Sequence, residues 1–173
     1  YLLEKSPRHI HNAERIQEVF PGAKMIVIYR DGRDVVTSDR FFHQDHLGRS
    51  FDFTEGVLGW KRDMEAHLRY AERYPVFACA YERLLADGAA VTRDLFQFLG
   101  LRYDDELIND LVERSSFRFY AGRRRGQEDR KRFYRKGVAG DWKNHFSAED
   151  RRIFKETAGD LLVQLGYEKD QSW

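Results

Sequence analysis

Two short apolar runs, separated by helical patterns, constrain the fold of this chain most. Residues 24–30 (Lys-Met-Ile-Val-Ile-Tyr-Arg) follow a Pro-Gly turn, and residues 76–81 (Val-Phe-Ala-Cys-Ala-Tyr) follow Tyr74-Pro75. Continuous hydrophobicity is typical of strands that are buried on both faces, as in a parallel sheet. Strands that alternate with helices predict an α/β fold, with a parallel sheet flanked by helices in three layers.

Helical patterns fill most of the chain around these two runs. We expect helices over residues 34–42, 53–73, 89–99 and 104–114, and a last helix that starts at a Ser147 cap and ends at Gly166. Asp34 is placed to act as the N-cap of the first of these helices. Trp60 and Trp142 are expected in the core. Residues 118–132 are polar and contain glycine, and we expect them to form a mobile loop.

Positive charge is concentrated in one segment. The 173 residues carry a net charge of +1 and are 42% hydrophobic, which suits one folded domain. Residues 123–136 contain eight Lys/Arg and two acids and carry +6, so the rest of the chain carries −5. A local basic field on a mildly acidic body predicts an anionic ligand at one place.

The single cysteine and the hydropathy of the chain bear on its location. Cys79 has no partner for an intramolecular disulfide, and its apolar surroundings favour a buried thiol. No run approaches the roughly 18 apolar residues of a membrane span, and no signal peptide is visible. These features favour the cytoplasm and no membrane partner. The chain begins without Met, so we expect residues 1–173 to be the C-terminal part of one larger domain.

The turn after the first apolar run carries groups that suit an anion. Arg30 ends the run, and Ser38 lies about one turn into the helix that follows. In open α/β sheets, ligands bind beyond the carboxyl ends of the strands, and a helix N-terminus adds partial positive charge. Arg30 and Ser38 therefore form a candidate phosphate site, although an arginine at a strand end also occurs for structural reasons alone.

A second candidate anion site lies about a hundred residues later, in residues 134–147 (Tyr-Arg-Lys-Gly-Val-Ala-Gly-Asp-Trp-Lys-Asn-His-Phe-Ser). Arg135 offers planar paired donors and Lys136 a compact charge, while Gly137 lets backbone N–H groups approach a ligand closely. This combination is too specific for an ordinary solvated basic loop.

Both segments resemble signatures of the sulfotransferases that use 3′-phosphoadenosine 5′-phosphosulfate (PAPS). Residues 134–147 are similar to the signature R-K-G-x-x-G-D-W-K-N-x-F, and residues 30–38 to R-[DN]-x-[RK]-D-V-x-x-S. The resemblance implies that Arg30, Ser38, Arg135, Lys136 and Gly137 hold the 3′-phosphate of the nucleotide. It also implies a fold like that of P-loop nucleoside-triphosphate hydrolases, here without the first strand and its loop.

Weaker similarities imply an adenine pocket. Tyr81 begins a segment similar to the family's Y-E-x-L, whose tyrosine contacts adenine. Ser115 and Phe117 match the first and third residues of a T-S-F segment that lines the base, and Phe133 matches a stacking aromatic. For each of these residues a purely structural role in the core remains an alternative.

The catalytic groups are harder to place. The resemblance puts Lys5 near a family lysine that touches the sulfate, but the position of the family's catalytic histidine falls near Pro7. His9 is our candidate base, with His11 as a nearby substitute, because an imidazole has a suitable pKa. A histidine at a helix start can also be purely structural, and a Glu or His upstream of residue 1 is an equal alternative for the base. The glycine-rich phosphosulfate loop of the family is not found. No metal-ligand spacing occurs, and sulfuryl transfer needs no metal in principle.

The sequence therefore predicts transfer of a sulfuryl group from PAPS to a hydroxyl or amine acceptor, either a small molecule or a carbohydrate. A homodimer is possible, and no nucleic acid is expected as a partner. Three alternatives stay open: a nucleotide-binding remnant without catalysis, a nucleic-acid-binding module built on the basic segment, and a kinase-like P-loop protein.

Overall fold

The computed structural model describes residues 2–173. Two parallel strands, β1 (Met25–Tyr29) and β2 (Val76–Ala80), form the sheet, with Met25 opposite Val76 and Tyr29 opposite Ala80. Both predicted strands are present, and β1 ends one residue before Arg30. The expectation that they are buried on both faces is wrong: no residue of β1 is fully buried, Ile28 is 59% exposed, and Cys79 is the one buried residue of β2. The remaining elements are, in chain order, the 3-10 helix η1 (Pro7–Asn12), α1 (Ala13–Val19), α2 (Gly32–His46), α3 (Phe53–Ala71), α4 (Tyr81–Ala86), α5 (Gly88–Leu99), α6 (Asp105–Arg114), α7 (Phe117–Ala121), the 3-10 helix η2 (Asp141–Asn144) and α8 (Ala148–Gln164).

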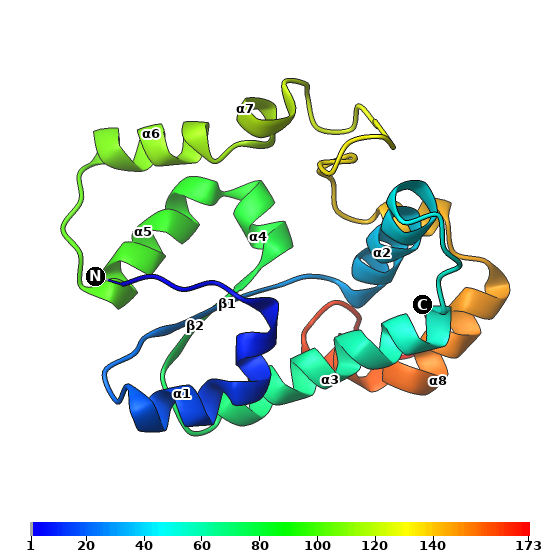
Figure 1. Cartoon of the computed structure of the whole chain (residues 1–173), viewed down its shortest axis with the longest axis horizontal. Coiled ribbons are helices and arrows are strands. Elements are labelled where there is room, and N and C mark those ends of the chain that lie inside the picture. Colours follow the sequence, from blue (N-terminus) through cyan, green and yellow to red (C-terminus); the bar gives the residue numbers. More distant parts are fainter. Residues whose placement is uncertain (1) are drawn as a thin grey trace.

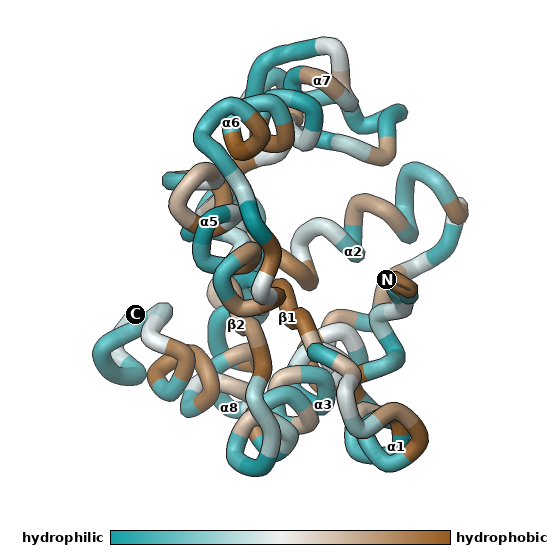
Figure 2. Tube along the Cα trace, turned by 90° about the vertical axis from the view of Figure 1, so that its left-hand side faces the viewer, coloured by the Kyte–Doolittle hydropathy of each residue, from teal (hydrophilic) through white to brown (hydrophobic). Residues whose placement is uncertain are grey.

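Helices cover both faces of the two strands, as the predicted three-layer α/β fold requires. In Figures 1 and 2, α4 to α7 lie above the strands and α1, α3 and α8 below them. The Phe77 ring of β2 meets Phe98 of α5, with 5.9 Å between ring centroids. On the other face, Tyr29 stacks on His67 of α3 at 5.8 Å. The hydropathy colouring shows the strands as an apolar centre between these helices (Figure 2).

The largest hydrophobic core lies between α2, α3 and α8. Val36, Val57, Trp60, Phe154 and Leu162 are at most 5% exposed and belong to one cluster. The predicted core positions of Trp60 and Trp142 are confirmed, since both are buried. Cys79 is also buried. Burial of this apolar surface drives the packing of the long helices on one another.

The C-terminal segment folds back onto the start of α2. The Arg33 guanidinium lies between the rings of Trp142 and Trp173, 4.0 and 4.4 Å from their centroids. Its nitrogens pair with Asp31 at 2.7 Å and with Glu168 at 2.5 Å. A buried arginine that is both paired and stacked ties the turn after β1, the 3-10 helix η2 and the chain end together.

Among residues 2–173, no helix is both long enough and apolar enough to cross a membrane.

Candidate functional site

The two signature segments meet at the carboxyl end of β1. Asp34, in the first turn of α2, accepts hydrogen bonds from the backbone N–H groups of Gly140 at 2.7 Å and Trp142 at 3.0 Å. The N-cap of α2 is Asp31, whose side chain accepts from the Arg33 N–H, so the prediction of Asp34 as the cap is wrong. Asp34 is 1% exposed and uses its carboxylate to hold the second segment against the first.

Arg30 faces the same junction. Its Nη2 donates to the carbonyl of Val138 at 2.9 Å and lies 3.3 Å from the Asp34 carboxylate. The Tyr81 ring, at the start of α4, covers the guanidinium with 5.0 Å between its centroid and Cζ. Nε of Arg30 is buried and has no hydrogen-bond acceptor among the described residues. A buried donor without an acceptor is costly, and an anion in the adjoining cleft would satisfy it.

Arg135 and Lys136 converge on a single buried carboxylate. Asp141 accepts from Nη2 of Arg135 at 2.7 Å and from Nζ of Lys136 at 2.6 Å. Asn144 adds a third hydrogen bond at 3.1 Å. Burial alone would raise the pKa of Asp141, but these donors outweigh it and hold the pKa well below its usual range. Asp141 is therefore a carboxylate over the whole working pH range, and it fixes the direction of both cations.

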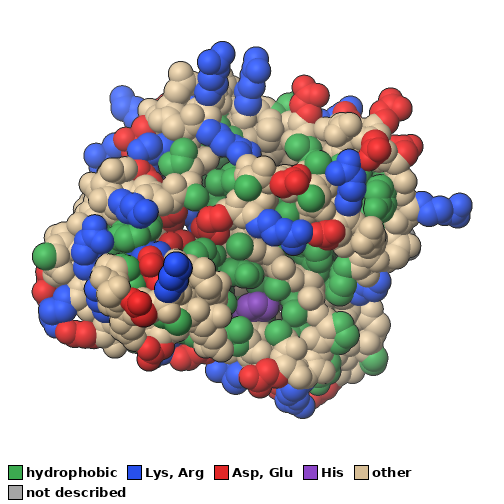
Figure 3. Space-filling model, turned by 180° about the vertical axis from the view of Figure 1, so that it is seen from behind, with side chains coloured by type: hydrophobic (Ala, Val, Ile, Leu, Met, Phe, Trp, Pro, Cys, Tyr) green, Lys and Arg blue, Asp and Glu red, His purple; other side chains and the backbone are tan. Residues whose placement is uncertain are grey.

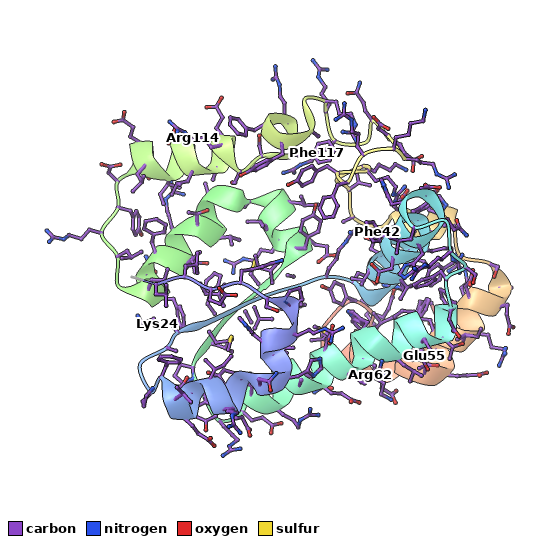
Figure 4. All side chains as sticks on the ribbon, in the orientation of Figure 1. Lys24, Phe42, Glu55, Arg62, Arg114 and Phe117 are labelled. Atoms are coloured by element: carbon purple, nitrogen blue, oxygen red, sulfur yellow. The ribbon has the colours of Figure 1, made fainter. Side chains whose placement is uncertain are left out.

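Gly137 allows the backbone to pass close to an aromatic ring. Its φ is +66°, a region that favours glycine. A Cβ at this position would overlap the ring of Phe117, which lies on α7 (Figure 4). The glycine thus brings the backbone after Lys136 into contact with the α7 side of the site.

A cleft of about 310 Å³ collects most of the predicted binding residues. Its predicted members are Arg30, Ser38, Tyr81, Phe117, Phe133, Arg135, Lys136 and Gly137. Phe117 comes from α7, and Phe133 packs edge-to-face against Phe42 of α2, with 6.5 Å between the ring centroids; Figure 4 labels Phe117 and Phe42. Cations and N–H groups at the end of a strand, with aromatic rings beside them, can hold a phosphate and an aromatic base.

Three predicted site residues lie outside this cleft. Ser115 is exposed at the end of α6, and its hydroxyl donates to the Val112 carbonyl at 3.3 Å. Lys5 precedes η1 and His9 lies within it, and neither lines the cleft. His11, in contrast, pairs through Nε2 with Asp63 of α3 at 2.7 Å. The catalytic roles of Lys5 and His9 stay predictions.

The segment before the second signature is more structured than predicted. Residues 117–121 form α7, so the expectation of a loop over 118–132 is wrong at its start. The following residues pair with the signature: Gly126 N–H donates to the Lys136 carbonyl and Asp129 N–H to the Arg135 carbonyl, both at 2.9 Å. Figure 1 shows this yellow segment descending from α7 towards α2.

The sequence analysis did not identify two residues of the site. Glu128 forms an ion pair with Nη1 of Arg135, and Phe41 of α2 packs against the same guanidinium at 4.2 Å. An acidic residue inside a basic run is the one signal that could have pointed to Glu128. Phe41 carries no such signal, because Arg135, on which it packs, is far away in the sequence.

Charge elsewhere on the molecule is mixed. On the face opposite to that of Figure 1, acidic and basic side chains are interspersed around hydrophobic patches (Figure 3). Within residues 2–173, no group of three or more His, Cys, Asp or Glu side chains has an arrangement that could hold a metal ion.

Comparison with known proteins places this chain in a family. The family model described as the sulfotransferase domain matches residues 4–166. Human sulfotransferase 2A1 is 29% identical over 168 residues, which are 83% of this chain and 59% of that protein. The guinea-pig (Cavia porcellus) 3-beta-hydroxysteroid sulfotransferase is 27% identical over 178 residues, with 87% of this chain and 62% of that protein covered.

A solved structure agrees with the fold. The crystal structure of mouse sulfotransferase SULT7A1 complexed with PAP superposes with a TM-score of 0.67 at 22% identity, over 84% of this chain and 63% of that one. The chain thus spans about three fifths of the length of these relatives. Because the family model covers nearly all of the sequence, the chain belongs to the sulfotransferase family.

Proposed function

We propose that this chain binds the 3′-phosphoadenosine part of PAPS and belongs to an enzyme that transfers the sulfuryl group to a hydroxyl or amine acceptor. One observation carries the proposal. Arg30 and Ser38 line the same cleft as Arg135 and Lys136, although the two pairs are about a hundred residues apart in the chain. Separate segments that bring cations and a hydroxyl to one place at the end of a strand form a phosphate site.

Two further observations support a nucleotide with a 3′-phosphate. Nε of Arg30 is buried without an acceptor, as expected for a donor that awaits an anion. The structural neighbour from mouse is complexed with PAP, which is adenosine 3′,5′-bisphosphate, the part of PAPS that remains after sulfuryl transfer. We assign the 3′-phosphate to Arg30, Ser38, Arg135, Lys136 and the Gly137 N–H. The adenine lies among Tyr81, Phe117 and Phe133.

The bound nucleotide would supply the sulfuryl group. The acceptor oxygen or nitrogen forms a bond to sulfur, the bond from sulfur to the bridging phosphate oxygen breaks, and the acceptor proton passes to a base. Lys5 and His9 remain our candidates for the sulfate contact and for the base. Of the two histidines, His11 has its ring held by a hydrogen bond between Nε2 and Asp63.

The acceptor and the location complete the proposal. A small-molecule acceptor is supported by the guinea-pig relative, which is named for hydroxysteroids, and a carbohydrate remains the alternative. A cytoplasmic location agrees with the buried, single Cys79. We keep a homodimer as a prediction.

Nucleotide affinity tests the proposal. We would titrate the chain with adenosine 3′,5′-bisphosphate, AMP and ATP by calorimetry. The same titrations with Arg30→Ala and Arg135→Ala would follow, with Arg49→Ala as a control from the exposed loop after α2. The parent and the control should prefer the bisphosphate over AMP by about tenfold or more, and both cleft variants should lose that preference. Equal affinities in the parent would contradict the proposal.

A nucleic-acid-binding role has one observation in its favour. Arg118, Arg124, Lys131 and Arg132 are basic side chains that are exposed on the surface. A single-stranded RNA oligomer in the same calorimeter separates the two functions, because phosphate-backbone binding weakens steeply with salt. We expect no binding of the oligomer at 0.15 M salt, whereas salt-dependent binding that the bisphosphate does not displace would favour the rival.

A further inference from the structure

The guanidinium of Arg135 is held by two carboxylates of different character. Nη2 pairs with Asp141 at 2.7 Å, and Nη1 pairs with Glu128. The Arg135 side chain is 14% exposed and stacks on Phe41, so its orientation is restricted. An incoming phosphate therefore meets an arginine whose two terminal nitrogens already have anionic partners.

The Asp141 carboxylate cannot easily move away from Arg135. Its side chain is 2% exposed and binds Lys136 and Asn144 as well as Arg135. The backbone on both sides of it is fixed, because the N–H groups of Gly140 and Trp142 are bound to Asp34. Moving the Asp141 carboxylate, which is itself buried, would break its hydrogen bonds to Arg135, Lys136 and Asn144 at once, which is costly.

The Glu128 carboxylate, in contrast, can move away from Arg135 at little cost. Its side chain is 35% exposed, and it pairs with Arg135. Glu128 reaches Arg135 because the backbone around it is hydrogen-bonded to the signature, through the N–H groups of Gly126 and Asp129. A rotation of the side chain towards solvent would free Nη1 of Arg135 without breaking either backbone bond.

We propose that the two carboxylates act on Arg135 in opposite ways: Asp141 is a positioning residue for the cations of the nucleotide site, and Glu128 is a displaceable occupant of the place that the 3′-phosphate takes. This inference rests on the proposed function. A fixed carboxylate pre-orients Arg135 and Lys136 and lowers the cost of binding. A mobile carboxylate competes with the phosphate and returns when the nucleotide leaves, so Glu128 weakens binding and speeds release.

Two isosteric substitutions separate these roles by the sign of their effect. Glu128→Gln should tighten binding of adenosine 3′,5′-bisphosphate by about fivefold, mainly through slower dissociation, and Asp141→Asn should weaken it by about tenfold. Removal of a negative charge near a phosphate would, by itself, tighten binding in both variants. Affinity for AMP, which has no 3′-phosphate, should be unchanged by Glu128→Gln.

Matched controls complete the experiment. Asp129→Asn removes the neighbouring charge, whose carboxylate bonds to the Lys131 N–H at 3.0 Å, and should change the affinity by less than about twofold. In an Arg135→Ala background, Glu128→Gln should have no effect, because no guanidinium remains to be released. Thermal unfolding of each variant checks that the fold is kept, and the Glu128 arm stands even if Asp141→Asn does not fold.

The outcomes distinguish this inference from the function on which it rests. A parent chain that binds AMP and the bisphosphate equally contradicts the proposed function, and the inference with it. A parent that prefers the bisphosphate, combined with tighter binding in both variants or with equal gains from Glu128→Gln and Asp129→Asn, contradicts the inference alone.

Discussion

Asp34 and Gly140, which are 106 residues apart in the chain, are joined by a hydrogen bond of 2.7 Å from the Gly140 N–H to the Asp34 carboxylate. The same carboxylate binds the Trp142 N–H and lies beside Arg30. The contact fixes the distance between the turn after β1 and the segment that carries Arg135. The proposed phosphate site is therefore assembled by tertiary contacts, and each half depends on the other.

Replacement of Asp34 by asparagine should destabilise the protein. An amide nitrogen cannot accept a hydrogen bond, so one of the two N–H groups loses its acceptor, and the adjacent Arg30 loses a buried counter-charge. We expect the free energy of unfolding to fall by about 3 kcal/mol, measured by urea denaturation. Asp110→Asn, which breaks an exposed pair with Arg114 on α6, is the control and should cost less than about 1 kcal/mol. Equal losses in the two variants would show that the Asp34 contact is not a structural junction.

The two glycines of the signature should tolerate alanine differently. Both have positive φ, +66° at Gly137 and +78° at Gly140, so each substitution costs about 1 kcal/mol of backbone strain. At Gly137 the new Cβ also meets the Phe117 ring, whereas Gly140 has open space. Gly137→Ala should therefore displace Phe117 and weaken binding of adenosine 3′,5′-bisphosphate. Gly140→Ala should leave the affinity nearly unchanged, and similar affinities for the two variants would argue against the close approach.

His67 should make stability depend on pH in a mildly acidic window. The ring is 4% exposed, Nδ1 has no hydrogen-bond partner among residues 2–173, and burial lowers the pKa of His67 below its ordinary 6.5. The unfolded chain then binds the proton first, so the free energy of unfolding should fall as the pH drops from 7.5 to 5.5. His67→Phe keeps the stacking on Tyr29 and should show a smaller fall. Chemical denaturation at both pH values measures the difference, and an unchanged fall would rule His67 out.

Much of the fold could be predicted because it follows from local patterns. The two apolar strands and the long helices can be recognised from their hydrophobic patterns, and the predicted helix over 34–42 lies inside α2. The N-cap was misplaced because Asp31 and Asp34 are both suitable capping residues. The tertiary hydrogen bonds that bury Asp34 leave no local signature. The α7 helix was missed because it is five residues long, although Ser116 caps it.

The sequence indicated some residues of the candidate site but not the contacts between them, because those contacts are also tertiary. Arg30 and Ser38 lie in one cleft because both follow the carboxyl end of β1. Arg135 reaches the same cleft from the loop before η2, which the hydrogen bonds of Asp34 to Gly140 and Trp142 hold in place. Ser115 lies outside this cleft, and its hydroxyl bonds back to its own helix, a contact that spacing does not reveal. The ion pairs of Asp141 and Glu128 with Arg135 depend on how residues 122–141 fold on themselves. The sequence shows only that Asp141 and Glu128 are negatively charged.

One double-mutant cycle tests the central claim that Arg30 and Arg135 hold the same phosphate. Affinity for adenosine 3′,5′-bisphosphate, relative to AMP, would be measured for the parent, Arg30→Ala, Arg135→Ala and the double variant. We predict that each single change removes most of the preference, by about tenfold, and that the double variant loses little more. The losses are not additive because both arginines bind one phosphate, and either change alone already removes most of its contribution to affinity. Additive losses, or a preference that survives either change, would contradict the account.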